Sequence, residues 1–253
     1  MERIIEKTDD GSATLFVPEL NEHYHSTKGA RTESQHIFID MGLKASPAFS
    51  PKVLEVGFGT GLNAWLTLEE AERSTRNVHY TGLELYPLDW ETVGQLGYIS
   101  NDEQLTVNAQ PQPAIKLFKQ IHTVSWEEES LLTSHFTLLK IEADINEWAS
   151  AYLKKEGNAS NVPTVHSQFS NFNSQFDVVY FDAFAPEKQP EMWTKELFAL
   201  LYVLLNEDGI LTTYCAKGVV RRMLQASGFI VERLPGPPGG KREILRARKI
   251  KKD

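Results

Sequence analysis

The strongest constraint on the fold comes from residues 53–63, where a short apolar run leads into three closely spaced glycines. The apolar, β-branched run predicts a strand in a sheet that is covered on both faces. Gly57, Gly59 and Gly61 let the backbone turn sharply and approach a ligand without Cβ clashes. A helical pattern begins at Asn63, so free N–H groups at a helix N-terminus are expected to face that ligand.

The spacing of the glycines indicates which ligand the turn holds. Dinucleotide-binding turns have the form G-x-G-x-x-G, whereas this turn has the form G-x-G-x-G, which is one residue tighter. Glu55 precedes the first glycine by two residues, and a carboxylate there suits a cation better than a pyrophosphate. The E-x-G-x-G-x-G form resembles motif I of class I S-adenosylmethionine (SAM) methyltransferases, whose cofactor is cationic and lacks phosphate. The alternative is a structural glycine turn in another α/β domain.

Composition bounds the class of protein. A chain of 253 residues with 41% hydrophobic residues suits one large domain. We expect a single domain over residues 1–253, with an N-terminal extension at 1–45 and a SAM-binding core at 46–253. The single cysteine, Cys215, excludes an internal disulfide and a multi-cysteine zinc site. No apolar run approaches the roughly 20 residues that span a bilayer, and residues 1–7 lack a signal-peptide pattern. A cytoplasmic protein without membrane contact is therefore expected.

The N-terminal residues predict a hairpin and a helix. An Asp-Gly turn joins two β-prone runs within residues 3–20, which is a strong local hairpin pattern. A helix is expected from Thr32 to Met41, capped by Thr32 with Gln35 three positions on, as in a capping box. Three histidines lie in this region: His23, His25 and His36. Without a neighbouring cysteine or an H-x-x-x-H spacing, hydrogen-bonded or solvated histidines are favoured, and no metal is expected.

Acidic residues end two further predicted strands. The strand at 78–84 ends in Glu84, about 20 residues past the glycine turn, where a nucleotide-binding α/β fold places a carboxylate on the ribose hydroxyls. The strand at 137–144 ends in Asp144, which is expected to bond an adenine amino group while Ile145 packs on the ring. The alternatives are an exposed strand-end glutamate and a helix N-cap, respectively.

A third acidic strand end lies within residues 176–186. Its strand, 178–181, is followed directly by Asp182, at the carboxyl edge where open α/β sheets bind ligands. Phe184 and Pro186 make the following loop apolar and stiff. Such a loop suits a site in which a carboxylate holds a polar acceptor and an aromatic ring lines the pocket.

The order of the predicted elements indicates the fold class. Strands and helices alternate through most of the chain, which predicts a mostly parallel sheet. The elements expected after Asp182 are a helix from Gln189 to Leu205, a strand at 210–215, a helix at 218–227 and strands at 228–234 and 243–248. The last two strands have no helix between them, so they are expected to pair antiparallel at one edge. Residues 155–175 are rich in Asn and Ser and predict a surface insertion. We therefore expect a seven-stranded, Rossmann-like α/β sheet with the class I SAM-dependent methyltransferase topology.

Five motifs carry a closer resemblance: EVGFGTGLN at 55–63, DINE at 144–147, FDAFAP at 181–186, PEMWT at 190–194 and GKREIL at 240–245. Together they resemble the methyltransferase domain of the tRNA-modifying MnmC family, and residues 21–38 are also similar to that domain. The likeness covers nearly the whole chain. It implies SAM-dependent N-methylation of 5-aminomethyl(2-thio)uridine at the tRNA wobble position, which gives 5-methylaminomethyl(2-thio)uridine.

The chain also departs from that family. Bifunctional members carry a second, FAD-dependent oxidase domain. This sequence ends at Asp253 without a second glycine fingerprint. We therefore expect a stand-alone methyltransferase that uses no FAD, with separate upstream tRNA-modifying enzymes as expected partners. The oxidase would then be either a separate protein or unnecessary in this cell.

The resemblance also implies roles for individual residues. Asp182 is expected to orient the acceptor amine and take its proton, while Tyr24, Phe184 and Pro186 line the pocket for the uridine. The expected cofactor contacts are Glu55, Gly57, Gly59, Gly61 and Asn63 at the methionine end, Glu84 at the ribose, and Asp144 with Ile145 at the adenine. Lys241 and Arg242 open a basic stretch of seven positive charges in the last 13 residues. This stretch is expected to meet tRNA phosphates despite the net charge of -8, and a solvated basic tail is the alternative.

Three other classes of function remain as alternatives. A methyl- or aminopropyltransferase that acts on a small-molecule amine would share the fold and an acidic pocket. A non-catalytic tRNA-binding or assembly protein would lack affinity for SAM, which the intact glycine turn disfavours. The glycine spacing disfavours an NAD-dependent oxidoreductase.

Overall fold

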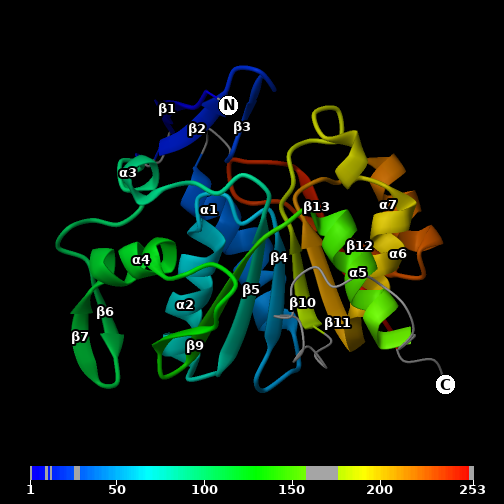
Figure 1. Ribbon diagram of the computed structural model, residues 1–253. Coiled ribbons are helices and arrows are strands. Elements are labelled where there is room, and N and C mark those ends of the chain that lie inside the picture. The colour runs from blue at the N-terminus through cyan, green and yellow to red at the C-terminus, as the bar shows by residue number, and fades with distance from the viewer. Residues whose placement is uncertain (1, 9–10, 12, 26–28, 158–175, 251–253) are drawn as a thin grey trace.

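An eight-stranded, mostly parallel sheet forms the centre of the protein (Figure 1). The computed structural model describes residues 2–8, 11, 13–25, 29–157 and 176–250. The strands lie in the order β12-β13-β11-β10-β4-β5-β9-β8. Their bounds are β4 (Lys52–Val56), β5 (Val78–Glu84), β8 (Ser130–Thr133), β9 (Phe136–Glu142), β10 (Phe176–Phe181), β11 (Leu205–Thr213), β12 (Ile230–Pro235) and β13 (Glu243–Arg248).

Seven of these strands are the ones expected from the sequence, and the predicted α/β class is confirmed. The five strands β11, β10, β4, β5 and β9 run parallel, and β13 lies antiparallel between β11 and β12. The eighth strand, β8, pairs antiparallel with β9 at the edge. The sequence pattern does not predict it, because its four residues are too few to show alternation and Leu131 is 73% exposed.

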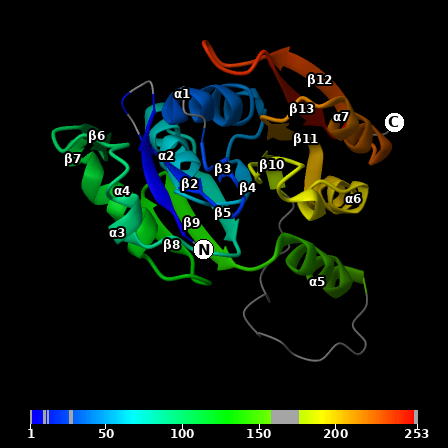
Figure 2. The same ribbon diagram turned by 90° about the horizontal axis from the view of Figure 1, so that it is seen from above.

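Helices cover both faces of the sheet (Figures 1 and 2). The helices on one face are α2 (Leu62–Ser74), α4 (Ala114–Thr123) and the π-helix η1 (Gln35–Asp40). Those on the other face are α5 (Ile145–Gly157), α6 (Lys195–Leu204) and α7 (Gly218–Ala226). The alternation of side chains along a strand divides the interior accordingly. Val53 of β4 belongs to the same apolar cluster as Trp65 of α2, whereas Leu54 and Val56 belong to the cluster that contains Leu197 of α6.

The N-terminal extension folds as a small sheet beside the carboxyl end of the main one (Figure 1). It contains β1 (Ile4–Lys7), β2 (Ala13–Val17), β3 (Glu22–His23), α1 (Ala30–Ser34), η1 and the 3-10 turn η2 (Leu43–Ala45). The predicted hairpin is present as β1 and β2, and the turn positions 9, 10 and 12 lie outside the described residues. Ala13 and Leu15 pack in the same apolar core as Trp65, so the extension is packed onto the sheet domain.

The predicted capping box at Thr32 is wrong. The helix α1 begins at Ala30 after Gly29, and no side chain caps it. Gln35 instead donates to Asp40 Oδ1 at 3.1 Å, within the turn where the helix continues as η1. Thr32 therefore lies inside the helix rather than at its N-cap, and Gln35 bonds within the next turns instead of reaching back.

The structure divides one predicted helix and adds elements in two further segments. The long helix expected from Gln189 is split into the 3-10 turn η3 (Pro190–Met192) and α6, because Thr194 caps α6 by accepting from Leu197 N at 3.1 Å. The helix α3 (Trp90–Val93) is a single turn capped by Asp89. Residues 97–136, which the pattern left largely unassigned, contain the hairpin of β6 (Gln104–Val107) and β7 (Gln110–Pro113), then α4 and β8. The expected insertion at 155–175 lies, from residue 158 on, outside the described residues.

Across the described part of the chain, no helix has both the length and the apolar character needed to cross a bilayer.

Gly82 of β5 lies against the Phe58 ring of the glycine turn, where a side chain has no room. A Cβ at Gly82 would lie 2.4 Å from the Phe58 ring. We expect Gly82→Ala to lower the free energy of unfolding by about 1–3 kcal/mol, because the buried ring must shift. Urea denaturation measures this loss. In a Phe58→Ala background the same substitution should cost clearly less, since the clash is gone, and simple additivity of the two costs would contradict the prediction.

Candidate active site

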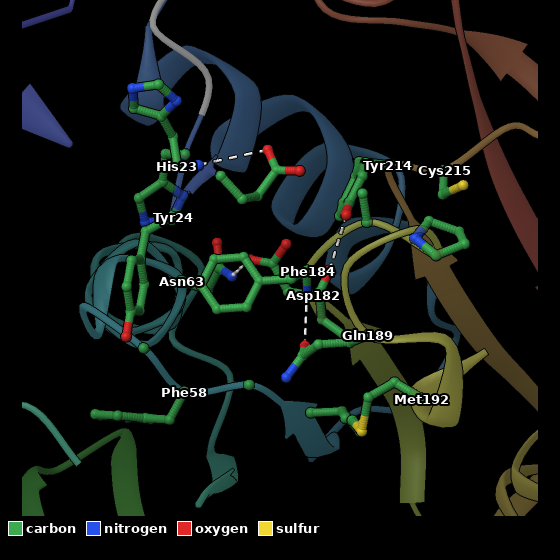
Figure 3. Close-up of a pocket in the computed structure, with 18 of the residues that line it drawn as sticks. His23, Tyr24, Phe58, Asn63, Asp182, Phe184, Gln189, Met192, Tyr214 and Cys215 are labelled. Atoms are coloured by element: carbon green, nitrogen blue, oxygen red, sulfur yellow. Dashed lines mark hydrogen bonds between the residues drawn. The ribbon is translucent and has the colours of Figure 1, made fainter. Parts of the chain in front are cut away.

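A cavity of about 880 Å³ opens where the parallel strands end. The glycine turn, the acidic strand ends and the N-terminal extension all contribute to its wall (Figure 3). Most residues predicted from the sequence line it: Tyr24, Gly57, Gly59, Asn63, Glu84, Asp144, Ile145, Asp182, Phe184, Pro186, Lys241 and Arg242. Two predicted residues, Glu55 and Gly61, are not part of the wall.

The glycine turn forms the floor of the cavity, and its glycines are required by close contacts. Gly57 has a φ of 87°, and a Cβ there would lie 2.8 Å from the Asp182 carbonyl oxygen. A Cβ at Gly59 would lie 3.2 Å from the Tyr24 ring. Gly61, with a φ of 67°, is the N-cap residue of α2 and lies behind the wall. These positions need glycine because no other residue combines the left-handed backbone with so little space.

Glu84 lies at the end of β5 and faces the cavity, as predicted. Its Oε2 accepts from Gly59 N at 2.9 Å, and its Oε1 accepts from Tyr86 N at 2.9 Å. The carboxylate is thereby tied to the glycine turn. Each oxygen retains a lone pair for a ligand hydroxyl.

Glu55 lies beneath the wall, where it holds other side chains. Its side chain is fully buried, and its two oxygens accept from Asn63 Nδ2 at 2.8 Å and from the Tyr80 hydroxyl at 2.6 Å. Strand alternation turns Glu55 toward the α2 side of the sheet, away from the open edge. Burial raises its pKa well above the usual range, and the two donors oppose that rise. In this structure Glu55 therefore supports the site through Asn63 and Tyr80, and its direct contact with the cofactor stays a prediction.

Asp144 caps a helix. Its Oδ1 accepts from Asn146 N at 2.7 Å and from Glu147 N at 3.2 Å. This is the N-cap alternative for Asp144, realised at the start of α5. Asp144 and Ile145 still line the cavity, so a contact with the adenine of a bound cofactor stays a prediction.

The loop after β10 is held rigidly in place. The Tyr214 hydroxyl donates to Ala183 O at 2.8 Å, Phe184 N donates to Gln189 Oε1 at 3.1 Å, and Trp193 Nε1 donates to Phe184 O at 2.7 Å. The Phe184 ring meets the Tyr24 ring edge-on, with centroids 5.0 Å apart (Figure 3). These three hydrogen bonds hold the loop, so the aromatic wall next to Asp182 is preorganised.

Asp182 has an unusual electrostatic environment. Burial raises its pKa to about 7, and Glu33 adds to the rise, while the hydrogen bond from Asn63 and the charge of Lys241 oppose it. Asn63 Nδ2 donates to Asp182 Oδ2 at 2.8 Å (Figure 3). A carboxyl group with a pKa near neutrality can exchange a proton at physiological pH.

Several cavity residues were missed by the sequence analysis. Glu33 binds Lys241 in an ion pair of 2.8 Å, and the Lys241 ammonium lies 3.8 Å from the centroid of the Tyr214 ring. His25 Nε2 bonds Thr60 Oγ1 of the glycine turn at 2.8 Å, and burial lowers the pKa of His25 to about 4. Tyr214 follows β11 and was detectable by the same strand-end rule that found Asp182. No local pattern marks Glu33.

The three N-terminal histidines that the sequence analysis considered as metal ligands make hydrogen bonds. His23 Nε2 bonds Glu6 at 2.9 Å, and His36 Nε2 bonds Pro235 O at 2.8 Å. Within the described ranges, no three His, Cys, Asp or Glu side chains gather in a way that would hold a metal ion.

Much of the basic C-terminal stretch is used within the fold. Arg246 and Arg248 both donate to Glu232 Oε2, at 2.7 and 3.1 Å. Lys249 Nζ donates to Leu205 O at 2.6 Å. Lys251 and Lys252 lie outside the described residues. Of the predicted phosphate contacts, Arg242 is exposed at the cavity and Lys241 is paired with Glu33.

The chain matches known proteins over most of its length. The tRNA 5-methylaminomethyl-2-thiouridine biosynthesis bifunctional protein MnmC of Pseudomonas putida is 27% identical over 231 residues, which are 88% of this chain and 31% of that protein. MnmC of Magnetococcus marinus is 29% identical over 244 residues, 92% of this chain and 32% of that protein. This chain resembles MnmC. It spans about a third of the length of these curated relatives.

The fold is similar to those of solved structures. MnmC2 from Aquifex aeolicus superposes with a TM-score of 0.70 at 25% identity, covering 97% of this chain and 70% of that chain. Spermidine synthase from Thermotoga maritima, at 14% identity and a TM-score of 0.52 over 98% of this chain and 72% of that chain, shares the fold alone. A family model for S-adenosyl-L-methionine-dependent methyltransferases matches residues 158–250. The fold is therefore that of the class I SAM-dependent methyltransferases, as the sequence predicted, and the likeness to MnmC supports a SAM-dependent methyltransferase.

The cavity fits SAM by its size and chemistry. Its volume lies within the range of small-molecule sites. Gly57 and Gly59 leave the backbone accessible where a side chain would collide with Asp182 or Tyr24. Glu84 supplies a carboxylate at the strand end, where it can accept hydrogen bonds from the hydroxyl groups of a ribose.

The raised pKa of Asp182 predicts a pH-dependent cost to stability. In the folded protein Asp182 keeps a proton up to about pH 7, whereas an unfolded chain loses it near pH 4. The folded state then binds more protons than the unfolded state, so the contribution of Asp182 to stability falls as pH rises through this window.

We therefore expect Asp182→Asn to gain stability relative to the unmodified protein between about pH 4.5 and about pH 8, by on the order of 1–3 kcal/mol. Urea unfolding at both pH values measures the difference. The exposed Glu129→Gln is the matched control for the loss of one carboxylate. An Asp182→Asn difference that is constant with pH would contradict the prediction.

Proposed function

We propose that this chain transfers a methyl group from SAM to the primary amine of 5-aminomethyl(2-thio)uridine at the tRNA wobble position, giving 5-methylaminomethyl(2-thio)uridine. One observation carries the proposal. Asp182, with a pKa of about 7, lies in one cavity with the glycine turn and the Tyr24–Phe184 aromatic wall. The likeness to MnmC over about nine-tenths of the chain supports this acceptor.

The chemistry asks mainly for positioning. SAM supplies an electrophilic methyl group on a sulfonium, and the acceptor amine must be neutral to offer its lone pair. Asp182 accepts a hydrogen bond from that amine, which orients the lone pair in line with the methyl group. As the nitrogen gains a bond to carbon it must lose a proton, and Asp182 takes it. The pKa of Asp182 near 7 suits both steps at neutral pH.

The aromatic wall serves the uracil ring. A base can react in a protein cavity only after it has left the stack of the anticodon loop. Unstacked bases bind RNA-modifying proteins by stacking on aromatic side chains. The Phe184 and Tyr24 rings, which meet edge-on at 5.0 Å, offer one such surface, and Pro186 extends its apolar rim.

The tRNA itself is the proposed partner. Arg242 is exposed at the cavity and is the described residue best suited to a phosphate near the flipped base. Lys241 is also exposed, but it is paired with Glu33, so it is less suited to a phosphate than Arg242. The cytoplasm, where tRNA is modified, is the proposed location. The aminomethyl group is supplied by a separate upstream tRNA-modifying enzyme.

The proposal is tested with labelled SAM and bulk tRNA from a strain whose wobble uridines stop at the aminomethyl stage. Label recovered in 5-methylaminomethyl(2-thio)uridine after nucleoside analysis supports the reaction, substrate and position together. Tight binding of SAM by calorimetry without any labelled nucleoside would contradict the tRNA substrate. The search would then turn to small-molecule amines as acceptors of methyl or aminopropyl groups.

Asp182 should matter for turnover and little for cofactor binding. We expect Asp182→Ala to lower kcat by on the order of 10²–10⁴, the range for loss of a positioned acid–base group. The affinity for SAM, measured by calorimetry, should change by no more than roughly threefold, which is under about 1 kcal/mol. Turnover that survives within a few-fold would exclude Asp182 as the group that handles the amine.

A further inference from the structure

Asn63 connects the buried carboxyl group of Glu55 with the carboxyl group of Asp182 at the cavity. Its single Nδ2 atom donates to Glu55 Oε1 and to Asp182 Oδ2, both at 2.8 Å. The side chain is 2% exposed and lies at the first turn of α2, directly behind the glycine turn. An amide nitrogen has two hydrogens, so each carboxyl group receives one of them.

Glu55 fixes the orientation of the Asn63 amide. Glu55 is itself held by the Tyr80 hydroxyl at 2.6 Å and has no exposure to solvent. Turning the amide over would set its oxygen against two carboxyl oxygens, which is unfavourable unless both carry protons. Tyr80, Glu55, Asn63 and Asp182 therefore form one chain of hydrogen bonds that leads from the interior to the cavity.

We propose that Asn63 is a positioning residue for Asp182, and that Glu55 acts on the site through Asn63 rather than by touching a cofactor. The proposal rests on the proposed function, in which Asp182 handles the acceptor amine. Asn63 fixes Oδ2 of Asp182 and thereby aims Oδ1 at the amine. The same bond stabilises the charged form of Asp182, the form that accepts the proton.

Other groups also act on Asp182, and they bound the size of the effect. The titratable or charged groups that face it are Glu55 of β4, Tyr80 of β5, Glu33 of α1, Tyr214 after β11 and Lys241 before β13. Glu33 disfavours the charged form and Lys241 favours it. Asn63 is the group that reaches Asp182 through a direct side-chain bond, so its removal is expected to have a separable effect.

The test follows the titration of Asp182 directly. Protein labelled with ¹³C at aspartate carboxyl groups is titrated by NMR, and the Asp182 signal is assigned as the one lost in Asp182→Asn. We expect Asn63→Ala to move the midpoint of Asp182 upward by on the order of one pH unit, because a donor to the charged form is lost. The acid limb of the kcat profile with tRNA should move with it.

Tyr80→Phe is the second variant, and it lies outside the cavity wall. It removes the donor that holds Glu55, so Glu55 holds the Asn63 amide less firmly. The Asp182 midpoint should therefore move upward, but by less than in Asn63→Ala. This variant keeps the proposal testable if Asn63→Ala does not fold. Circular dichroism and urea unfolding check the fold of both proteins.

Two outcomes would overturn the proposal. One is an Asp182 midpoint that stays in place in both variants. The other is a loss of SAM affinity of roughly tenfold or more in Asn63→Ala with an unmoved midpoint, which would make Asn63 a cofactor contact. The NMR titration needs no turnover, so a failure of the tRNA assay and a failure of this proposal are distinguishable.

Discussion

The site depends on the contact between the glycine turn after β4 and the acidic loop after β10. These strands are neighbours in the sheet, and Asp182 N donates to Val56 O at 3.0 Å across the gap. A Cβ at Gly57 would lie 2.8 Å from the Asp182 carbonyl. Parallel pairing brings the two strand ends to one edge, and the missing side chain lets them close. The backbone thereby sets the floor of the cavity against the start of the loop that carries Asp182, and the Asn63 side chain then holds its carboxylate.

A second constraint is the cost of burying acid. Glu55 and Asp182 lie within reach of one amide, and burial raises the pKa of both. These placements cost stability, because removing a carboxyl group from water is unfavourable. Such local costs are typical of functional sites, where activity and stability compete. The chain offsets them with two apolar cores, one on each face of the sheet.

The features that could be predicted from the sequence are those that depend on residues close together in the chain. The glycine turn, the strand-end position of Glu84 and Asp182, and the antiparallel last strands each follow from a few adjacent residues. Asp144 was placed at the cavity, and its capping bonds to Asn146 and Glu147 realise an alternative that the sequence left open. The edge strand β8 escaped prediction because four residues with an exposed Leu131 show no period. Glu33 was not found because its partner, Lys241, is 208 residues away, and a single sequence does not reveal such pairs.

That distant ion pair has a consequence for how the molecule is made. One side of the cavity joins α1, near the start of the chain, to the segment before the last strand. β13 then inserts between β11 and β12, so the sheet receives an inner strand after the outer one has been synthesised. Contacts this far apart in sequence form late and slowly, because a long loop must close first. The side of the cavity that contains the Glu33–Lys241 pair can therefore close only after the ribosome has synthesised the final strand pair.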